Sequence, residues 1–295
     1  MTKILVTGSN GFLGQHIAAQ AGNMPNMHLT GWSKRGAIHN YCNDFKTINL
    51  LENDITPEMV APFDAVIHTA ALSHVDYCEQ HREEAFRINV EATRQIAKAC
   101  RQTGTHLIHL SSDFVFPGKD EPVAENDKTN PVNYYGRTKE MAEIYVQTIC
   151  PQSTIIRPVL IFGPVLSGTR SNLVLWVKSA LEAGKAIQVT SDHMRTATYV
   201  KDLAALCLQA AQKPQRGIYH ACGADYLSVH EMALQVANVF ELDSQLITPV
   251  NSSTFKAQEP RPACSRFSAD KAIKGFGFKS RSFEDTLKDM KQNAE

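Results

Sequence analysis

Tyr135 and Lys139 are four residues apart in a segment whose apolar spacing is typical of a helix. Residues at this spacing lie on the same helical face, so the lysine ammonium would lie beside the phenol. A phenol has a pKa of about 10, and a neighbouring positive charge lowers it, which lets a tyrosine act as a general acid near neutral pH. The pair therefore predicts proton transfer. The alternative interpretation is an ordinary exposed helix start.

Ser112 follows an expected strand at residues 106–111. The carboxyl ends of the strands in an open α/β sheet are where ligands bind. Ser112 is therefore a candidate site residue beside the tyrosine and the lysine. The alternative is a serine that only shapes the turn after the strand.

A glycine-rich segment lies between the first expected strand, residues 3–7, and a helix. Glycines at Gly8 and Gly11 allow a tight turn and a close approach of the backbone to a pyrophosphate, and Gly14 allows the helix to pack closely on the sheet. The free N–H groups at the helix start would face the phosphates. The segment predicts a dinucleotide site, rather than a purely structural turn, with the contacts Gly8, Asn10, Gly11, Phe12, Leu13 and Gly14.

The residues that follow the second expected strand, at 27–32, are Ser33, Lys34 and Arg35. A site that prefers NAD usually places a carboxylate at this point, against the ribose 2′-hydroxyl. A hydroxyl and two cations suit a 2′-phosphate instead, so the sequence favours NADP, with NAD as the alternative cofactor. The two cations are otherwise an ordinary solvated loop.

Short β-branched or apolar runs alternate with helical patterns, which predicts an α/β fold with a doubly wound parallel sheet of the Rossmann type. The expected strands are 3–7, 27–32, 46–50, 65–70, 106–111 and 154–161. We expect a cofactor-binding domain at residues 1–157 and a smaller C-terminal substrate lobe at 158–295, part of which, about 195–222, is a candidate for returning to the first domain. Helix starts are expected at Ser228, which has a capping-box spacing to Glu231, and after Ser282.

The composition excludes several classes of function. Thirty basic residues balance thirty acidic ones in 295 residues, so no net charge attracts nucleic acid or an anionic membrane. No apolar run reaches the roughly 20 residues that cross a bilayer, and the N-terminus lacks a secretory pattern, so we expect a cytoplasmic protein. No metal site is expected, because the eleven histidines include no zinc-binding motif and the seven cysteines no Cys-x-x-Cys pair. A small molecule is the expected partner.

The chain resembles the extended short-chain dehydrogenases/reductases, and most of all the dTDP-4-dehydrorhamnose reductase group. The matching segments run through nearly the whole chain: Thr7–Gly14, Asp64–Ala71, Asn89–Thr93, Leu110–Gly118, Tyr135–Lys139, Arg157–Pro158 and Arg261–Ser265. The resemblance implies reduction of a keto group on a nucleotide-activated sugar by NADPH. The alternatives are an NAD-dependent sugar-nucleotide epimerase or dehydratase, and a non-catalytic regulatory subunit that resembles the methionine adenosyltransferase beta subunit. A homodimer is also allowed.

The resemblance implies a role for each matching residue. Tyr135 would protonate the substrate carbonyl oxygen, Lys139 would hold the nicotinamide ribose and lower the tyrosine pKa, and Ser112 would orient the carbonyl. The cofactor would also contact or depend on Asn49, Leu50, Ala70, Ala71 and Asn89.

The residues expected near the substrate are Asp113, Leu160, Arg195 and Arg261. Leu160 stands where the group has a sugar-stacking tryptophan, and Phe114 stands where it has a tyrosine, which leaves the sugar open. Arg195 is a candidate for a substrate phosphate, and a structural arginine paired with a carboxylate is the alternative.

Overall fold

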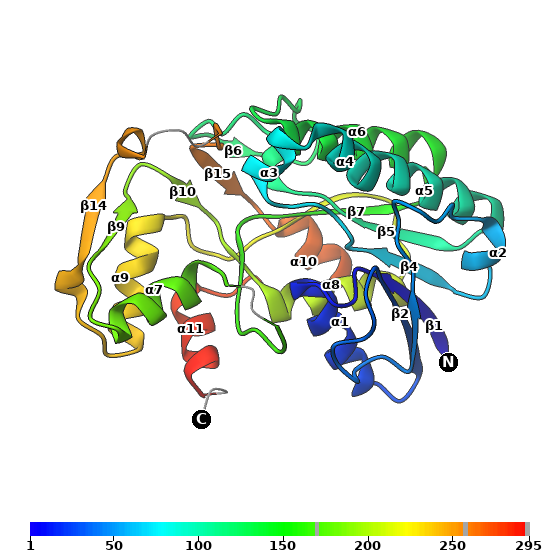
Figure 1. The fold of residues 1–295 in the computed structure, drawn as a ribbon, viewed down its shortest axis with the longest axis horizontal. Coiled ribbons are helices and arrows are strands. Elements are labelled where there is room, and N and C mark those ends of the chain that lie inside the picture. The colour runs from blue at the N-terminus through cyan, green and yellow to red at the C-terminus, as the bar shows by residue number, and fades with distance from the viewer. Residues whose placement is uncertain (169–170, 256–258, 293–295) are drawn as a thin grey trace.

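Seven parallel strands form the main sheet in a computed structural model, which describes residues 1–168, 171–255 and 259–292 (Figure 1). Their order is β12-β7-β5-β4-β1-β2-β3. The strands are β1 (Thr2–Thr7), β2 (Met27–Ser33), β3 (Asp44–Thr47), β4 (Ala65–His68), β5 (His106–Leu110), β7 (Thr154–Pro158) and β12 (Gly217–Ala221). The order reverses between β1 and β4, and a ligand of an open α/β sheet binds at such a switch point.

Helices cover both faces of the sheet, as a parallel sheet requires. In Figure 1, α5 and α6 lie above the strands and α1 and α8 below them. The lower layer contains α1 (Phe12–Gly22), α8 (Val200–Gln212) and α10 (Asp270–Phe276). The other helices of this part of the chain are α2 (Pro57–Val60), α3 (Val75–Gln80), α4 (Arg82–Phe86), the π-helical segment η1 (Arg87–Glu91), α5 (Ala92–Thr103) and α6 (Tyr134–Ile149).

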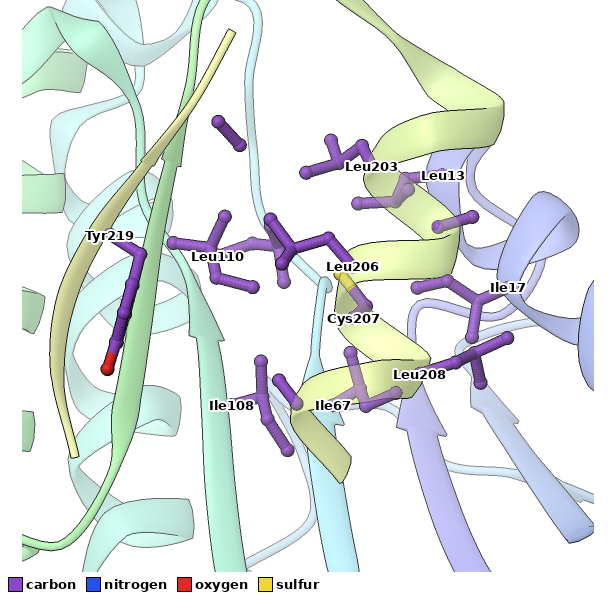
Figure 2. Packing of buried hydrophobic residues seen from close by; sticks show 14 of the residues in the cluster. Leu13, Ile17, Ile67, Ile108, Leu110, Leu203, Leu206, Cys207, Leu208 and Tyr219 are labelled. Carbon is purple, nitrogen blue, oxygen red and sulfur yellow. The ribbon is translucent and has the colours of Figure 1, made fainter. Parts of the chain in front are cut away.

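The core beneath the sheet is built from α8 and from the strand residues that face it. Figure 2 shows Leu203, Leu206 and Cys207 of α8 among side chains of α1 and of the central strands. Each of these three α8 residues is at most 1% exposed. Because α8 comes from the later part of the chain, this core fixes residues 200–221 to the sheet.

The smaller lobe has its own apolar cluster, built around three helices and a two-stranded sheet. These are α7 (Leu173–Glu182), α9 (Val229–Val239), α11 (Phe283–Gln292), β9 (Ile187–Thr190) and β14 (Ile247–Val250). The lobes are linked by the pair β8 (Ile161–Phe162) and β11 (Thr198–Tyr199) and by a sheet of β13 (Leu227–Ser228), β10 (Met194–Arg195), β15 (Cys264–Phe267) and β6 (Pro122–Val123). Three single turns of 3-10 helix complete the described elements: η2 (Asp113–Val115), η3 (Ser244–Leu246) and η4 (Ser252–Thr254).

The expected α/β fold with a doubly wound parallel sheet is confirmed, and so are the capping box at Ser228 and the helix after Ser282. The strand expected at 46–50 is wrong at both ends, since β3 spans Asp44–Thr47. The side chain of Asn49 accepts a hydrogen bond from Leu51 N in the turn that follows. The strand expected at 154–161 is interrupted, because Leu160 takes a φ of 34° between β7 and β8. No described helix combines the length and apolar character of a membrane span.

Leu206→Ala tests the importance of the α8 core. The substitution removes a side chain that is 1% exposed, so we expect it to lower the free energy of unfolding by about 2–5 kcal/mol. Leu234→Ala on α9, where the side chain is 37% exposed, is the control and changes stability by about 0.5 kcal/mol or less. Urea denaturation measures both, and equal losses would contradict the assignment of the core.

Candidate functional site

The N-terminus of α6 places Tyr135 and Lys139 at the carboxyl end of the sheet. Asn133 caps the helix, because its Oδ1 accepts a hydrogen bond from Gly136 N at 2.8 Å. Both Tyr135 and Lys139 are buried, and Lys139 Nζ donates to the carbonyl oxygen of Leu110 at the end of β5. The helix therefore holds the ammonium against the strand that leads to Ser112.

The turn that contains Ser112 packs directly on this end of α6. A Cβ atom on Gly136 would lie 2.2 Å from the carbonyl oxygen of Phe114, so only glycine allows the helix to come this close. The rings of Phe114 and Tyr135 meet edge to face with centroids 5.5 Å apart. The structure thus brings Ser112, Tyr135 and Lys139 to one place, as the sequence predicts.

Ser112 is held by its neighbour Asp113. The Ser112 hydroxyl donates to Asp113 Oδ1 at 3.1 Å and accepts from Phe114 N at 3.3 Å. The other carboxylate oxygen of Asp113 accepts a hydrogen bond from Ser265 of β15. Burial raises the pKa of Asp113, and the positive charge of Arg195 opposes that shift. Asp113 therefore connects the Ser112 turn to the smaller lobe.

Lys139 is 3% exposed, and this burial lowers its pKa from 10.5 to about 8, although the negative charge of Glu143 acts in the opposite direction. A buried ammonium close to its own pKa is sensitive to every nearby charge. The ammonium of Lys139 thus lies one helical turn from Tyr135, where its positive charge would stabilise a phenolate.

The glycine-rich segment forms the turn between β1 and α1. Gly8 has a φ of 73°, and a Cβ atom there would lie 2.9 Å from the backbone of Ala70. A Cβ on Gly14 would lie 2.3 Å from Gly8 O, so the helix packs closely on the turn. Gly11 precedes α1 and supplies no side-chain cap, which leaves first-turn N–H groups for an anion. Phe12 and Leu13 form this first turn, and Ala71 follows Ala70 at the opposite rim.

Asn10 connects the glycine-rich segment to the loop after β2. Its Nδ2 donates to Gly36 O at 2.9 Å, and its Oδ1 accepts from Ile38 N at 3.4 Å. Ser33 ends β2, and the side chains of Lys34 and Arg35 are exposed immediately after it. Asn10 therefore holds the loop that follows Lys34 and Arg35 beside the glycine-rich segment.

Asn89 connects the segment after β4 to helix α6. Its side chain forms hydrogen bonds with both the N–H and the carbonyl of Leu72, at 2.8 and 3.0 Å, and donates to Thr138 Oγ1 at 3.0 Å. Asn89 lies in the π-helical segment η1, and π-helical segments are frequent at functional sites. Sequence reasoning missed the contact of Thr138, although this residue lies within the segment Tyr135–Lys139.

Asn49 and Leu50, expected beside the adenine, form the turn after β3. Asn49 Oδ1 is used by the backbone of Leu51 at 3.2 Å, and Leu50 packs on the core beneath α5. Their contact with the cofactor stays a prediction.

Three predicted substrate residues come from the smaller lobe or the junction between lobes. Leu160 packs against the apolar clusters of both lobes. Arg195 is buried and donates to the carbonyl oxygens of Met194, Pro262 and Ala263, so these hydrogen bonds hold the backbone, whereas the structural alternative expected a carboxylate partner. Arg261 Nη2 donates to Asp76 of α3 at 3.1 Å and so links the two lobes. The hydrogen bond from Ser265 to Asp113 was not predicted from the sequence, although Ser265 lies in the matching segment Arg261–Ser265.

A separate cavity of about 680 Å³ lies between β6 and α10 and contains none of the predicted site residues. Lys271 lines it, but the Lys271 ammonium already donates to Ile218 O at 2.6 Å. Among residues 1–168, 171–255 and 259–292, no three histidine, cysteine or acidic side chains gather in a metal-binding arrangement.

The family model described as "RmlD substrate binding domain" matches residues 1–295. The chain belongs to this RmlD family. The resemblance inferred from the sequence is therefore confirmed.

Two relatives with different names show the breadth of the RmlD family. The chain is 30% identical over 275 residues to methionine adenosyltransferase 2 subunit beta of Bos taurus, covering 90% of this chain and 81% of the relative. It is 28% identical over 290 residues to dTDP-4-dehydrorhamnose reductase of Mycolicibacterium smegmatis, covering 97% and 84%.

Two solved structures share the fold. The dTDP-4-dehydrorhamnose reductase of Bacillus anthracis, a complex with NADP, superposes with a TM-score of 0.85 at 23% identity over 100% of each chain. MoeE5, a complex with UDP-glucuronic acid and NAD, gives 0.85 at 21% identity over 99% of this chain and 100% of its own.

Gly136→Ala tests the contact between α6 and the Ser112 turn. The added methyl group meets a carbonyl oxygen, so we expect a loss of about 1–3 kcal/mol in the free energy of unfolding. Gly22→Ala is the control, because its nearest neighbour would be 3.7 Å away and alanine favours a helix. Chemical denaturation compares the two, and a Gly136→Ala protein as stable as the control would show that the contact is loose.

Proposed function

We propose that this member of the RmlD family reduces a keto group on a nucleotide-activated sugar with NADPH. The observation that carries the proposal is the position of Tyr135 and Lys139 on one buried helical face beside Ser112. Regulation without catalysis would need only the glycine-rich segment that binds a nucleotide. The arrangement around α6 also supplies a proton donor, a cation and a hydroxyl group.

The residues around the β1–α1 turn fit a dinucleotide phosphate. The close approach of Gly8 to Ala70 leaves no room for a side chain, and α1 begins without a side-chain cap. Lys34 and Arg35 would hold a 2′-phosphate, which supports NADP over NAD. NADPH supplies the hydride when bound.

The protein's own part is to deliver and stabilise a proton. Tyr135 donates its phenolic proton to the carbonyl oxygen of the substrate, and the buried ammonium of Lys139 stabilises the phenolate that remains. Ser112 orients the same oxygen after its hydroxyl turns from Asp113 Oδ1 toward the substrate. Asp113 and Ser265 then keep the turn in place.

The substrate would lie between the lobes. Arg261 reaches α3 of the first lobe through Asp76, so its guanidinium is close enough to the junction to meet a nucleotide phosphate. Leu160 offers an apolar contact in the place of a stacking ring. Arg195 would act through the segment Pro262–Ala263 that it holds. These roles describe the class of substrate and leave its sugar to experiment.

A second candidate function is binding of NADP as a regulatory subunit. Its support is the 30% identity to methionine adenosyltransferase 2 subunit beta over most of the chain. An NAD-dependent epimerase or dehydratase differs from a reductase in its stoichiometry, because it returns the cofactor to its starting state. Consumption of NADPH therefore separates all three.

The first test is NADPH oxidation with a panel of 4-keto sugar nucleotides. We expect one equivalent of NADPH to be consumed per product with at least one of them. Tyr135→Phe keeps the ring against Phe114 and removes the proton donor, so turnover falls by about 100-fold or more.

The matched control is Tyr134→Phe, which changes the neighbouring half-buried tyrosine and retains activity. Equal turnover in Tyr135→Phe and the wild type would reject the acid assignment. No oxidation with any member of the panel, together with co-purification of a larger catalytic protein, would favour the regulatory function.

Arg35→Ala tests the cofactor preference. Loss of one charge-assisted hydrogen bond of about 1.4 kcal/mol would weaken NADPH binding about tenfold and leave NADH binding unchanged. Isothermal titration measures both cofactors. Lys98→Ala, which removes an exposed cation from α5, is the control. An NADPH preference equal to that of the wild type would remove the role of Arg35.

A further inference from the structure

The face of α6 that meets the sheet carries a third ionisable residue, Glu143, one turn beyond Lys139. Both Glu143 oxygens are held by Arg157 of β7, with Nε to Oε1 at 2.8 Å and Nη2 to Oε2 at 2.6 Å. The two side chains are only 2–3% exposed. Arg157 also donates to Glu125 O at 3.1 Å and lies over the ring of Phe116. The pair is therefore a fixed, bidentate contact in the interior.

The histidines around Lys139, Glu143 and Arg157 add no charge. His68 of β4 lies between two hydroxyl groups: Thr93 Oγ1 donates to Asn89 O and accepts from His68 Nε2, and Nδ1 lies 2.7 Å from Thr7 Oγ1. Burial, with a smaller contribution from the charge of Lys139, lowers the His68 pKa to about 3.

His109 of β5 faces His68, with ring centroids 5.5 Å apart. Neither of its ring nitrogens has a hydrogen-bond partner in the described part of the chain, and burial holds its pKa well below the usual value. His220 of β12 is also buried, and desolvation, helped by Arg157, lowers its pKa to about 3.

Two further acids lie at the start of α6. Asp113 of η2 accepts hydrogen bonds from Ser112 and Ser265 and lies in the field of Arg195. Glu79 of α3 accepts a hydrogen bond from Tyr134 N at 3.2 Å and forms an ion pair with Arg82. Because Arg157 binds both oxygens of Glu143, the acids at the helix start have their own partners and the histidines are neutral, Glu143 compensates the charge of Lys139 only in part.

We propose that Arg157 is a positioning residue: it holds both oxygens of Glu143, so that this carboxylate compensates Lys139 only in part, and thereby preserves the field of the ammonium at Tyr135. The inference rests on the proposed function, in which that field stabilises the phenolate. Acidic and basic side chains four residues apart on a helix attract each other, and a low-dielectric interior strengthens the attraction. Without Arg157, Lys139 would be the cation one turn from Glu143.

In this proposal, the role of Arg157 is to bind Glu143 in place of Lys139, and a contribution to folding stability is not required. A buried ion pair is weak support for stability, since apolar replacements of both partners are often tolerated. The two roles make different predictions for a charge-neutral double substitution, which removes the carboxylate together with the group that restrains it.

The experiment titrates the Tyr135 phenol by phenolate absorbance, without substrate. Each protein is compared with its own Tyr135→Phe version, so that the difference reports this tyrosine alone. We expect Arg157→Gln to raise the titration midpoint by about one pH unit, because an opposite charge now compensates Lys139. We expect Glu143→Gln/Arg157→Gln to return the midpoint to within a few tenths of the wild-type value.

Circular dichroism and NADPH binding establish that each variant is folded before titration. If Arg157→Gln does not fold, Arg157→Lys replaces it, because lysine keeps the charge but cannot bind both oxygens as a planar fork. It should raise the midpoint by less than one unit. An unchanged midpoint in the folded single variant, or a double variant shifted as far as the single one, would overturn the proposal.

The readout separates the two hypotheses. Titration of Tyr135 needs no turnover, so a shift in Arg157→Gln that the double variant reverses supports the electrostatic role even if no sugar nucleotide is reduced. Turnover that depends on Tyr135, with no shift on loss of Arg157, would keep the proposed function and reject the positioning role.

Discussion

Burial of a single ammonium group, that of Lys139, is the constraint on which the site depends. Because a charge in the interior is costly, α6 must hold the lysine against a carbonyl oxygen, which Leu110 supplies. The helix reaches that position only because Gly136 has no side chain and Asn133 caps the first turn. The start of α6, the end of β5 and the Ser112 turn therefore form one interlocked unit.

The smaller lobe completes this unit through contacts that span long stretches of sequence. Ser265 binds Asp113, Pro260 O accepts from Asn133 Nδ2 at 2.7 Å, and Arg261 pairs with Asp76. All three reach the first lobe from residues 260–265, close to the carboxyl ends of the strands. Arg195 supports the same segment from β10 by binding its carbonyl oxygens. The Ser112 turn and the smaller lobe are thus held by one shared segment, residues 260–265.

Local spacing in the sequence was enough to predict the parallel sheet, the glycine-rich turn and the Tyr135–Lys139 face, because each depends on residues close together in the chain. Partners such as Arg157 and Glu143, or Asp113 and Ser265, belong to separate elements, and their pairing depends on the packing of α6 and β15. The turn at Asn49 and the φ of Leu160 were missed for a related reason, since a side-chain hydrogen bond and the junction between lobes override strand propensity. Cofactor contacts at Lys34, Arg35 and Ala71 remain predictions.

The charged side chains of Lys139, Glu143 and Arg157 bear on the choice between catalysis and regulation. Binding a dinucleotide needs a glycine-rich turn, a helix start and a few cations near the ribose, all of which lie around β1 and β2. It does not need an ammonium whose pKa burial has lowered to about 8, nor an arginine that occupies the nearest carboxylate. Such an arrangement disfavours the charged form of Lys139 in the resting protein. The charged form is stabilised when a negative charge develops beside it. A phenolate that forms at Tyr135 as it releases a proton is such a charge, and this supports a reaction at the site in addition to binding.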